Sequence, residues 1–328
     1  MNASPLSVET RAAVLYITLD TPACAVNIFT HQAAVQLLAI LGAVEPGVRA
    51  VVFRSAKADS FINGASLMLG SAVSKPDDLP RLTEPIRRAY QALGELRVPT
   101  IAAMRGSCYG CGVELSLRCR YRVAGDSYDA HLRMTEIADY LLIPTFGSTQ
   151  ALPRLLGLER ATDFLLWGDT WPAREALAKG LLDGCFSDGE FDAAVEHVAT
   201  DLAVRGSSAL LAVPKQPPDI DVKAFGERTR ARIAGLPPAY RDVYGACYAL
   251  MERAALKETP DAADYEAEVL ASGLSILSPA SKASVAFFFV RQLGEQVSLR
   301  GARPPRSTVR VGCDSRFEGP RFFRETPL

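Results

Sequence analysis

Apolar residues in the first third of the chain occur in two alternating patterns. Runs at residues 13–19 and 50–54 are rich in β-branched and aromatic side chains and predict strands, and the apolar run at 98–104 predicts a third. Between them, the apolar positions of residues 30–44 and 85–96 recur at helical spacing and predict helices. Strands that alternate with helices predict an α/β layer built from right-handed β-α-β crossovers.

After Gly147 the pattern becomes mostly helical. Short helices are predicted at 148–156, 159–167, 172–179 and 191–204. The proline-containing segment 206–222 predicts a linker, and 223–297 predicts three or four amphipathic helices, with Ser278 as a cap. The last segment, 298–328, carries seven arginines and three acidic residues and predicts an irregular basic tail. That tail is either solvated surface or a contact for an anionic partner or ligand phosphate.

Composition narrows the functional classes. A chain of 328 residues that is 48% hydrophobic buries a sizeable core, and its net charge of −1 gives no general attraction to nucleic acid or membrane. The N-terminus lacks a signal-peptide pattern, and no uncharged apolar stretch is long enough to span a bilayer. Seven scattered cysteines then predict reduced thiols in a cytoplasmic protein. The lone pair Cys108 and Cys111 has no partner pair, so we expect no metal site.

Residues 104–117 carry the strongest chemical signal. They predict a buried strand ending at Gly106, a glycine-rich turn, and a helix with Glu114 in its first turns. A second turn of small residues lies at 61–67. Two such turns can aim two backbone N–H groups at one point, and a helix N-terminus adds partial positive charge there. This arrangement suits a thioester carbonyl that becomes an enolate oxyanion.

The chain resembles the enoyl-CoA hydratase/isomerase (crotonase) superfamily over residues 10–205. Four blocks fall in the family's order: the loop 24–29, the turn 61–67, the strand and glycine turn 98–114, and the segment 143–157, which is similar to the family's Ile-Pro-Gly-x-Gly-Gly-Thr-Gln-Arg-Leu-Pro-Arg-Leu-Leu-Gly. The resemblance implies a β-β-α spiral core over 1–205 that binds acyl-CoA and is capped by helices. It also implies a homotrimer or hexamer formed through a helical trimerisation region.

By this resemblance, the N–H groups of Ala65 and Cys111 form the oxyanion hole, and Glu114 activates water. Glu136 resembles the second catalytic glutamate, although Thr135 replaces the family's proline and the following glycine is missing. Because the segment that follows is a residue longer than usual, Asp139 is the competing acid/base. Cys111 replaces a glycine and is either a small apolar side chain beside the hole or, as the alternative, a nucleophile.

The resemblance also implies a substrate site. Backbone atoms of the loop 24–29 and small residues of the two turns would hold CoA, and these residues are Ala25, Val26, Ile28, Gly64, Ser66, Leu67 and Gly110. The expected activity is hydration or isomerisation of a 2-enoyl thioester carried by CoA or an acyl carrier. The alternatives are decarboxylation, hydrolysis or other tailoring of acyl thioesters, and a non-catalytic thioester-binding subunit.

The helices of 223–297 resemble the helical linker of multifunctional fatty-acid oxidation α-subunits. In those proteins a nicotinamide-binding domain follows. No Gly-x-Gly-x-x-Gly motif occurs in this chain, so we expect no cofactor other than the CoA of the substrate.

Overall fold

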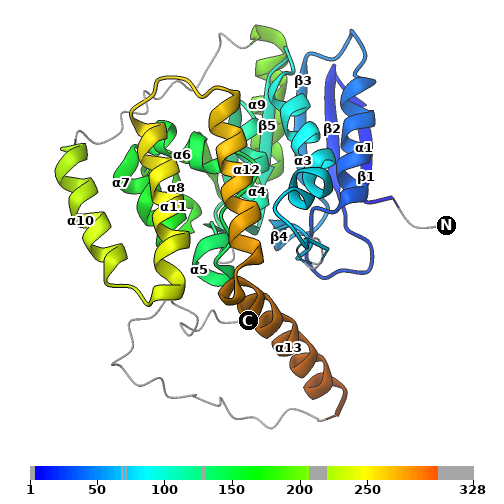
Figure 1. The fold of residues 1–328 in the computed structure, drawn as a ribbon. Coiled ribbons are helices and arrows are strands. Elements are labelled where there is room, and N and C mark those ends of the chain that lie inside the picture. Colours follow the sequence, from blue (N-terminus) through cyan, green and yellow to red (C-terminus); the bar gives the residue numbers. More distant parts are fainter. Residues whose placement is uncertain (1–3, 68–69, 71, 128–129, 207–219, 302–328) are drawn as a thin grey trace.

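The computed structural model describes residues 4–67, 70, 72–127, 130–206 and 220–301, with the side chains of 292–301 excepted. The predicted linker lies mostly outside these residues, and so does residue 302 onward of the predicted basic tail. The prediction of an irregular tail is wrong for residues 298–301, which continue the last helix. Figure 1 shows an α/β core with a helical region beside it.

The strands of the described residues form two sheets. The first has the order β1-β2-β3-β5-β7-β10, in which β1 is antiparallel to β2 and the other pairs are parallel; the second has the order β4-β6-β8-β9. The strand bounds are β1 (Leu6–Arg11), β2 (Val14–Leu19), β3 (Ala50–Ser55), β4 (Ser60–Asn63), β5 (Thr100–Met104), β6 (Ser107–Tyr109), β7 (Tyr121–Gly125), β8 (His131–Arg133), β9 (Trp171–Pro172) and β10 (Gly184–Phe186).

The chain passes repeatedly from the first sheet to the second. In each passage a strand of the first sheet leads to a strand of the second and then to a helix: β3-β4-α3, β5-β6-α4 and β7-β8-α5. These repeats stack in parallel, and the β-β-α spiral implied by the sequence resemblance is confirmed. The helices of the core are α1 (His31–Gly42), α3 (Asp78–Gly94), α4 (Cys111–Arg118), α5 (Glu136–Tyr140), α6 (Ser148–Leu156), α7 (Leu158–Ala161), the π-helical turn η1 (Thr162–Leu166), α8 (Ala173–Ala178) and α9 (Phe191–Arg205).

The first sheet is covered on both of its faces, because successive residues of its central strands are apolar. Side chains on one face of β2, β3, β5 and β7 pack against α9, and those on the other face join the main core with α1, α3 and α4. Both faces are therefore buried, as the continuous apolar runs of these parallel strands require.

Two predicted bounds within the core are wrong. The helix predicted to begin at Pro85 begins at Asp78, whose carboxylate accepts hydrogen bonds from the backbone N–H groups of Ser74 and Lys75 and so holds the preceding segment against the first turn. Pro85 lies inside the helix. The strand predicted to end at Gly106 ends at Met104, since Gly106 takes a left-handed φ of 70° and turns the chain into β6 of the second sheet.

The described part of the C-terminal region is helical, with α10 (Val222–Ala234), α11 (Pro238–Ala255), α12 (Ala262–Leu277) and α13 (Pro279–Gly301). The predicted cap is confirmed, because the Ser278 hydroxyl accepts a hydrogen bond from the Ser281 N–H. Figure 1 shows α12 running between α11 and α3, and α13 projecting away from the core. Among the described helices, none alone has the length and apolar composition to cross a membrane; α12 and the first part of α13 meet that criterion only as a pair, bent by 69°.

Candidate active site

Strand register brings the two predicted oxyanion turns together. β4 pairs in parallel with β6, with Ile62 opposite Cys108 and Asn63 opposite Tyr109. Both strands end there, so Gly64 and Gly110 each directly follow a paired residue and directly precede Ala65 and Cys111. A Cβ atom on Gly112 would lie 2.5 Å from the Ile62 carbonyl oxygen, so the first turn of α4 packs directly on β4.

The orientation of one amide follows from a single hydrogen bond. The Gly64 carbonyl accepts from the Phe29 N–H at 3.0 Å, on the side of β4 opposite to β6. In a trans peptide the C=O and the following N–H point in opposite directions. The Ala65 N–H therefore points away from Phe29. The Cys111 N–H is in the first position of α4 and has no acceptor within its own helix.

Gly110 shapes the turn before α4. Its φ of 53° and ψ of −119° are accessible to glycine and strained for other residues. Its N–H donates to the Arg133 carbonyl at 2.9 Å, which ties the turn to β8. A Cβ atom here would also collide with Oε1 of Glu136. The glycine thus permits both the turn and the close approach of a carboxyl group.

Cys111 is held by its carbonyl group. The buried Tyr90 hydroxyl of α3 donates to the Cys111 carbonyl at 2.8 Å. Burial raises the pKa of the Cys111 thiol well above its usual value, and the carboxyls of Glu136 and Glu114 raise it further. A thiol that stays protonated is a poor nucleophile, so the geometry favours the small apolar role over the nucleophilic one.

Glu114 is only 1% exposed, and one of its two carboxylate oxygens accepts hydrogen bonds. Its Oε1 accepts from the Phe146 N–H at 3.1 Å, from the Ser148 N–H at 3.3 Å and from the Ser148 hydroxyl at 2.8 Å. Burial raises its pKa, and these hydrogen bonds together with Arg118 oppose the rise. Donors that favour the charged form make Glu114 the carboxyl best suited to ionise here.

Glu136 is also buried, but in a different environment. It is the first residue of α5, and its Oε2 has no hydrogen-bond partner among the described residues. Burial, and then the charge of Glu114, raise the pKa of Glu136 to about 8. A buried carboxyl oxygen without a partner is costly in a purely structural role, which points to a group that meets a substrate or water.

Asp139, the competing acid/base, is occupied elsewhere. Both of its oxygens accept from the Arg133 guanidinium, at 2.7 and 2.6 Å. The helix α5 ends before Leu141, which takes a left-handed φ of 53°. With Asp139 held in an ion pair, the geometry favours Glu136 as the second carboxyl.

The predicted CoA loop lies next to the turn at Gly64. Ala25 and Val26 are exposed, whereas Ile28 is half-buried. The buried side chain of Asn27 anchors this loop: it accepts from the Thr21 N–H and donates to carbonyls of β2 and β4. Ser66 and Leu67, which follow Ala65, are half-buried. The two segments predicted to hold CoA, residues 25–28 and 64–67, therefore lie next to each other.

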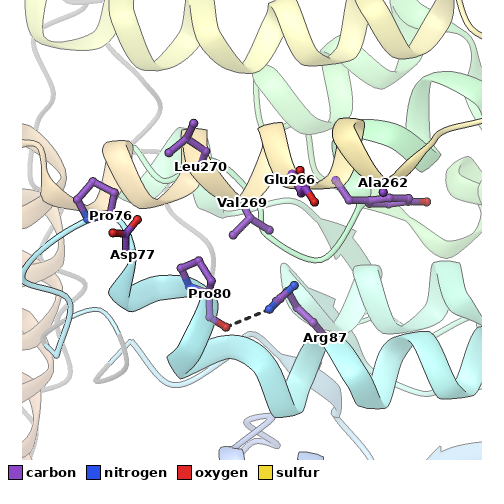
Figure 2. Close-up of a pocket in the computed structure, with 9 residues that line it drawn as sticks. Pro76, Asp77, Pro80, Arg87, Ala262, Glu266, Val269 and Leu270 are labelled. Atoms are coloured by element: carbon purple, nitrogen blue, oxygen red, sulfur yellow. Dashed lines mark hydrogen bonds between the residues drawn. The ribbon is translucent and has the colours of Figure 1, made fainter.

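A cavity of about 400 Å³ opens between α3 and α12. Figure 2 shows its two walls, with Pro80 and Arg87 from α3 facing Val269 and Glu266 from α12. Neither Glu114 nor Glu136 lines it. In the described ranges, no three His, Cys, Asp or Glu side chains are grouped so as to hold a metal ion.

Sequence reasoning missed three residues that support this site. They are Tyr90, which binds the Cys111 carbonyl, Asn27, which anchors the loop, and Glu268 of α12, which lies against the turn that holds Glu114. Each is a buried polar residue that binds a backbone group at least 21 residues away in sequence, which for Asn27 is the Phe61 carbonyl. The available signal for Glu268 was a glutamate among small and apolar residues of a predicted helix.

Comparisons with known proteins identify relatives of this chain. Fatty acid oxidation complex subunit alpha of Shewanella loihica is 34% identical over 172 residues, covering 52% of this chain and 24% of that protein. The corresponding subunit of Idiomarina loihiensis is 28% identical over 309 residues, covering 91% of this chain and 42% of that protein. The chain thus spans less than half the length of these relatives.

Solved structures share the fold. The structure of Pseudomonas aeruginosa DspI matches with a TM-score of 0.58 and 26% identity, covering 72% of this chain and 92% of that one. An enoyl-CoA hydratase from Mycobacterium avium subsp. paratuberculosis matches with a TM-score of 0.61 and 20% identity, covering 87% of this chain and 99% of that one. The family model for enoyl-CoA hydratase/isomerase matches residues 9–217. This chain belongs to the enoyl-CoA hydratase/isomerase family.

Proposed function

We propose that this protein hydrates 2-enoyl thioesters through an enolate held by the N–H groups of Ala65 and Cys111. In this mechanism, ionised Glu114 takes a proton from water as the water attacks the β-carbon. The negative charge moves to the thioester oxygen, where the two amides and the N-terminus of α4 stabilise it. Protonated Glu136 then delivers a proton to the α-carbon.

The observation that carries this proposal is the contrast between the two buried carboxyls. Glu114 receives three hydrogen bonds, whereas Oε2 of Glu136 receives none from the described part of the chain and the pKa of Glu136 is raised to about 8. Near neutral pH this arrangement supports a base at 114 and an acid at 136. Environments that push the pKa values of two carboxyls apart are the usual way in which a site assigns these two roles.

The presence of two carboxyls favours hydration over isomerisation. Moving a double bond between positions 2 and 3 requires one group to remove and return a proton, whereas hydration requires a base for water and a donor for the α-carbon. Because Asp139 is paired with Arg133, the second role falls to Glu136.

The relatives named as fatty acid oxidation subunits support an acyl-CoA substrate. The chain would then need no cofactor beyond the CoA of its substrate. The family's assembly suggests a homotrimer or hexamer, and the free thiols are consistent with a reducing compartment such as the cytoplasm.

The test follows the ultraviolet absorbance of the conjugated enoyl thioester with crotonyl-, decenoyl- and aromatic enoyl-CoA. Purified protein should consume at least one of them, and Glu114→Gln and Glu136→Gln should each lower kcat by about 10²- to 10⁴-fold. The exposed Glu258, changed to Gln, is the matched control. A loss of activity in only one of the two site variants favours another enolate reaction. Binding of CoA by the unchanged protein without turnover favours a non-catalytic binding subunit.

A further inference from the structure

The helix α12 presents a buried polar face to the turn that holds Glu114. Glu268, Ser272 and Ser275 are at most 4% exposed, and their spacing of four and then three residues places them on one face of the helix. Such side chains are expensive to bury without partners. Their partners are therefore informative.

The two serines bind the segment just before the turn. The Ser275 hydroxyl accepts from the Ile143 N–H at 3.0 Å, and the Ser272 hydroxyl donates to the Ile143 carbonyl at 2.7 Å. The hydroxyls of Thr145 and Ser272 lie 2.6 Å apart. The backbone from 143 to 145 is thus fixed by a helix more than a hundred residues later in sequence.

Glu268 of the same helix binds the turn itself, residues 146–149. Its Oε1 accepts from the Gly147 N–H at 2.6 Å, and its Oε2 accepts from the Thr149 N–H at 3.1 Å and is hydrogen-bonded to the Thr149 hydroxyl. The N–H groups of Phe146 and Ser148, which alternate with these, go to Glu114. The consecutive amides of residues 146–149 are thus shared alternately between two carboxyls.

We propose that Glu268 is a positioning residue for Glu114: from α12 it fixes the turn 146–149, so that the donors of Phe146 and Ser148 hold the Glu114 carboxylate toward the substrate. This inference rests on the proposed function, in which Glu114 is the base. Through Glu268, the C-terminal helices would help to position the base, although they lie more than a hundred residues after it in sequence.

The electrostatic environment supports Glu114 as the ionised base and Glu268 as its neutral neighbour. Burial, and then the charge of Glu114, raise the pKa of Glu268 to about 8. Two carboxylates on one turn repel each other, so one remains protonated while the other ionises. Near neutral pH, Glu268 is then the neutral partner. The other titratable groups facing the pair are Glu136, Arg118 and Cys111 around Glu114, Tyr90 of α3, and Cys247 of α11 beside Glu268.

The test compares two variants in the full-length protein, assayed with crotonyl-CoA. Glu268→Ala releases the turn and should lower kcat by about 10- to 100-fold with KM changed by less than about threefold, because the loss is one of orientation. Glu268→Gln is neutral like the protonated carboxyl and keeps one acceptor oxygen for the turn, so it gives up the hydrogen bond from only one of the Gly147 and Thr149 N–H groups. It should stay within about fivefold of the unchanged protein at pH 7.

The pH profile separates positioning from a merely structural role. Above pH 8 the unchanged protein gains a second negative charge beside Glu114, which disfavours a developing enolate nearby. Glu268→Gln lacks that charge and should keep a larger share of its pH 7 activity at pH 9. Asp264→Asn is the matched control: it changes a carboxyl on the same helix that faces Lys257, and its pH profile should superimpose on that of the unchanged protein.

A readout independent of activity is the pH dependence of thermal unfolding. A pKa raised in the folded state stabilises the protein at low pH, and this stabilisation is lost as the pH rises toward 8. Glu268→Gln should therefore flatten the decline of Tm between pH 5 and 8. If Glu268→Gln leaves the pH–activity profile and the Tm slope unchanged, or if Glu268→Ala keeps full kcat, the inference is wrong. If the unchanged protein consumes no enoyl-CoA while the Tm slope flattens, the proposed function fails and the coupling of Glu268 to its site stands.

Discussion

Gly110 and Glu136 are in van der Waals contact across the candidate site. The Glu136 carboxyl lies so close to the Gly110 Cα that a Cβ there would overlap Oε1. Gly110 directly precedes the helix that presents the Cys111 N–H, so this contact places the Glu136 carboxyl beside the proposed oxyanion hole. One glycine thereby links the second carboxyl to the first helix of the site.

This contact predicts the effect of a single methyl group. Gly110→Ala adds a Cβ at a φ of 53° and against a buried carboxyl, so it should destabilise the fold by about 1–3 kcal/mol and displace Glu136. We expect hydratase activity to fall by at least about 100-fold. Gly47→Ala is the control, because a Cβ at Gly47 meets no described atom within 4 Å. Equal effects of the two substitutions on activity and Tm would contradict this account.

The raised pKa values predict a bell-shaped dependence of kcat/KM on pH. Activity should rise with the ionisation of Glu114, whose pKa lies above the usual carboxyl range, and fall as Glu136 loses its proton near pH 8. In Glu136→Gln the residual activity should keep only the alkaline decline that Glu268 causes, and the double variant Glu136→Gln/Glu268→Gln should lack an alkaline limb. An alkaline limb that survives in the double variant would assign the acid to another group.

Glu136→Gln should also stabilise the protein while it inactivates it. The pKa of Glu136 is raised from its usual value to about 8, so the folded state binds a proton that the unfolded chain has already lost between about pH 5 and 8. Stability therefore declines as the pH rises through this window. Glutamine has no charge to desolvate, and we expect a gain on the order of 1–3 kcal/mol at pH 8, measured by denaturant unfolding. A loss of stability at that pH would show that Glu136 is a structural acceptor.

The loop at 24–29 gives a prediction about substrate binding. Asn27→Ala removes the hydrogen bonds to Thr21, Leu19 and Phe61 that anchor the loop beside Gly64. It should cost about 2–4 kcal/mol of stability and raise KM for the acyl-CoA more than it lowers kcat. Gln91→Ala, which removes an exposed amide that donates to Glu95, is the control. An unchanged KM would place CoA elsewhere.

The sequence indicated those parts of the site that arise from local pattern. The turns at Gly64 and Gly110 and the helix of Glu114 follow from glycine spacing and helical periodicity, which a single chain displays directly. Tyr90 and Glu268 were not predictable in the same way, because each binds a backbone group that only the folded chain brings near. The start of α3 was missed for a related reason, since the hydrogen bonds from Ser74 and Lys75 to the Asp78 carboxylate are visible only in three dimensions.

The central claim is that the Ala65 and Cys111 amides bind the same acyl oxygen. The most direct measurement is a crystal structure of the Glu114→Gln variant with crotonyl-CoA bound. We predict the thioester oxygen within about 2.7–3.1 Å of both amide nitrogens, with the substituted side chain at position 114 on one side of the acyl group and Glu136 near the α-carbon. A thioester oxygen that contacts only one of these amides, or neither, would contradict the account.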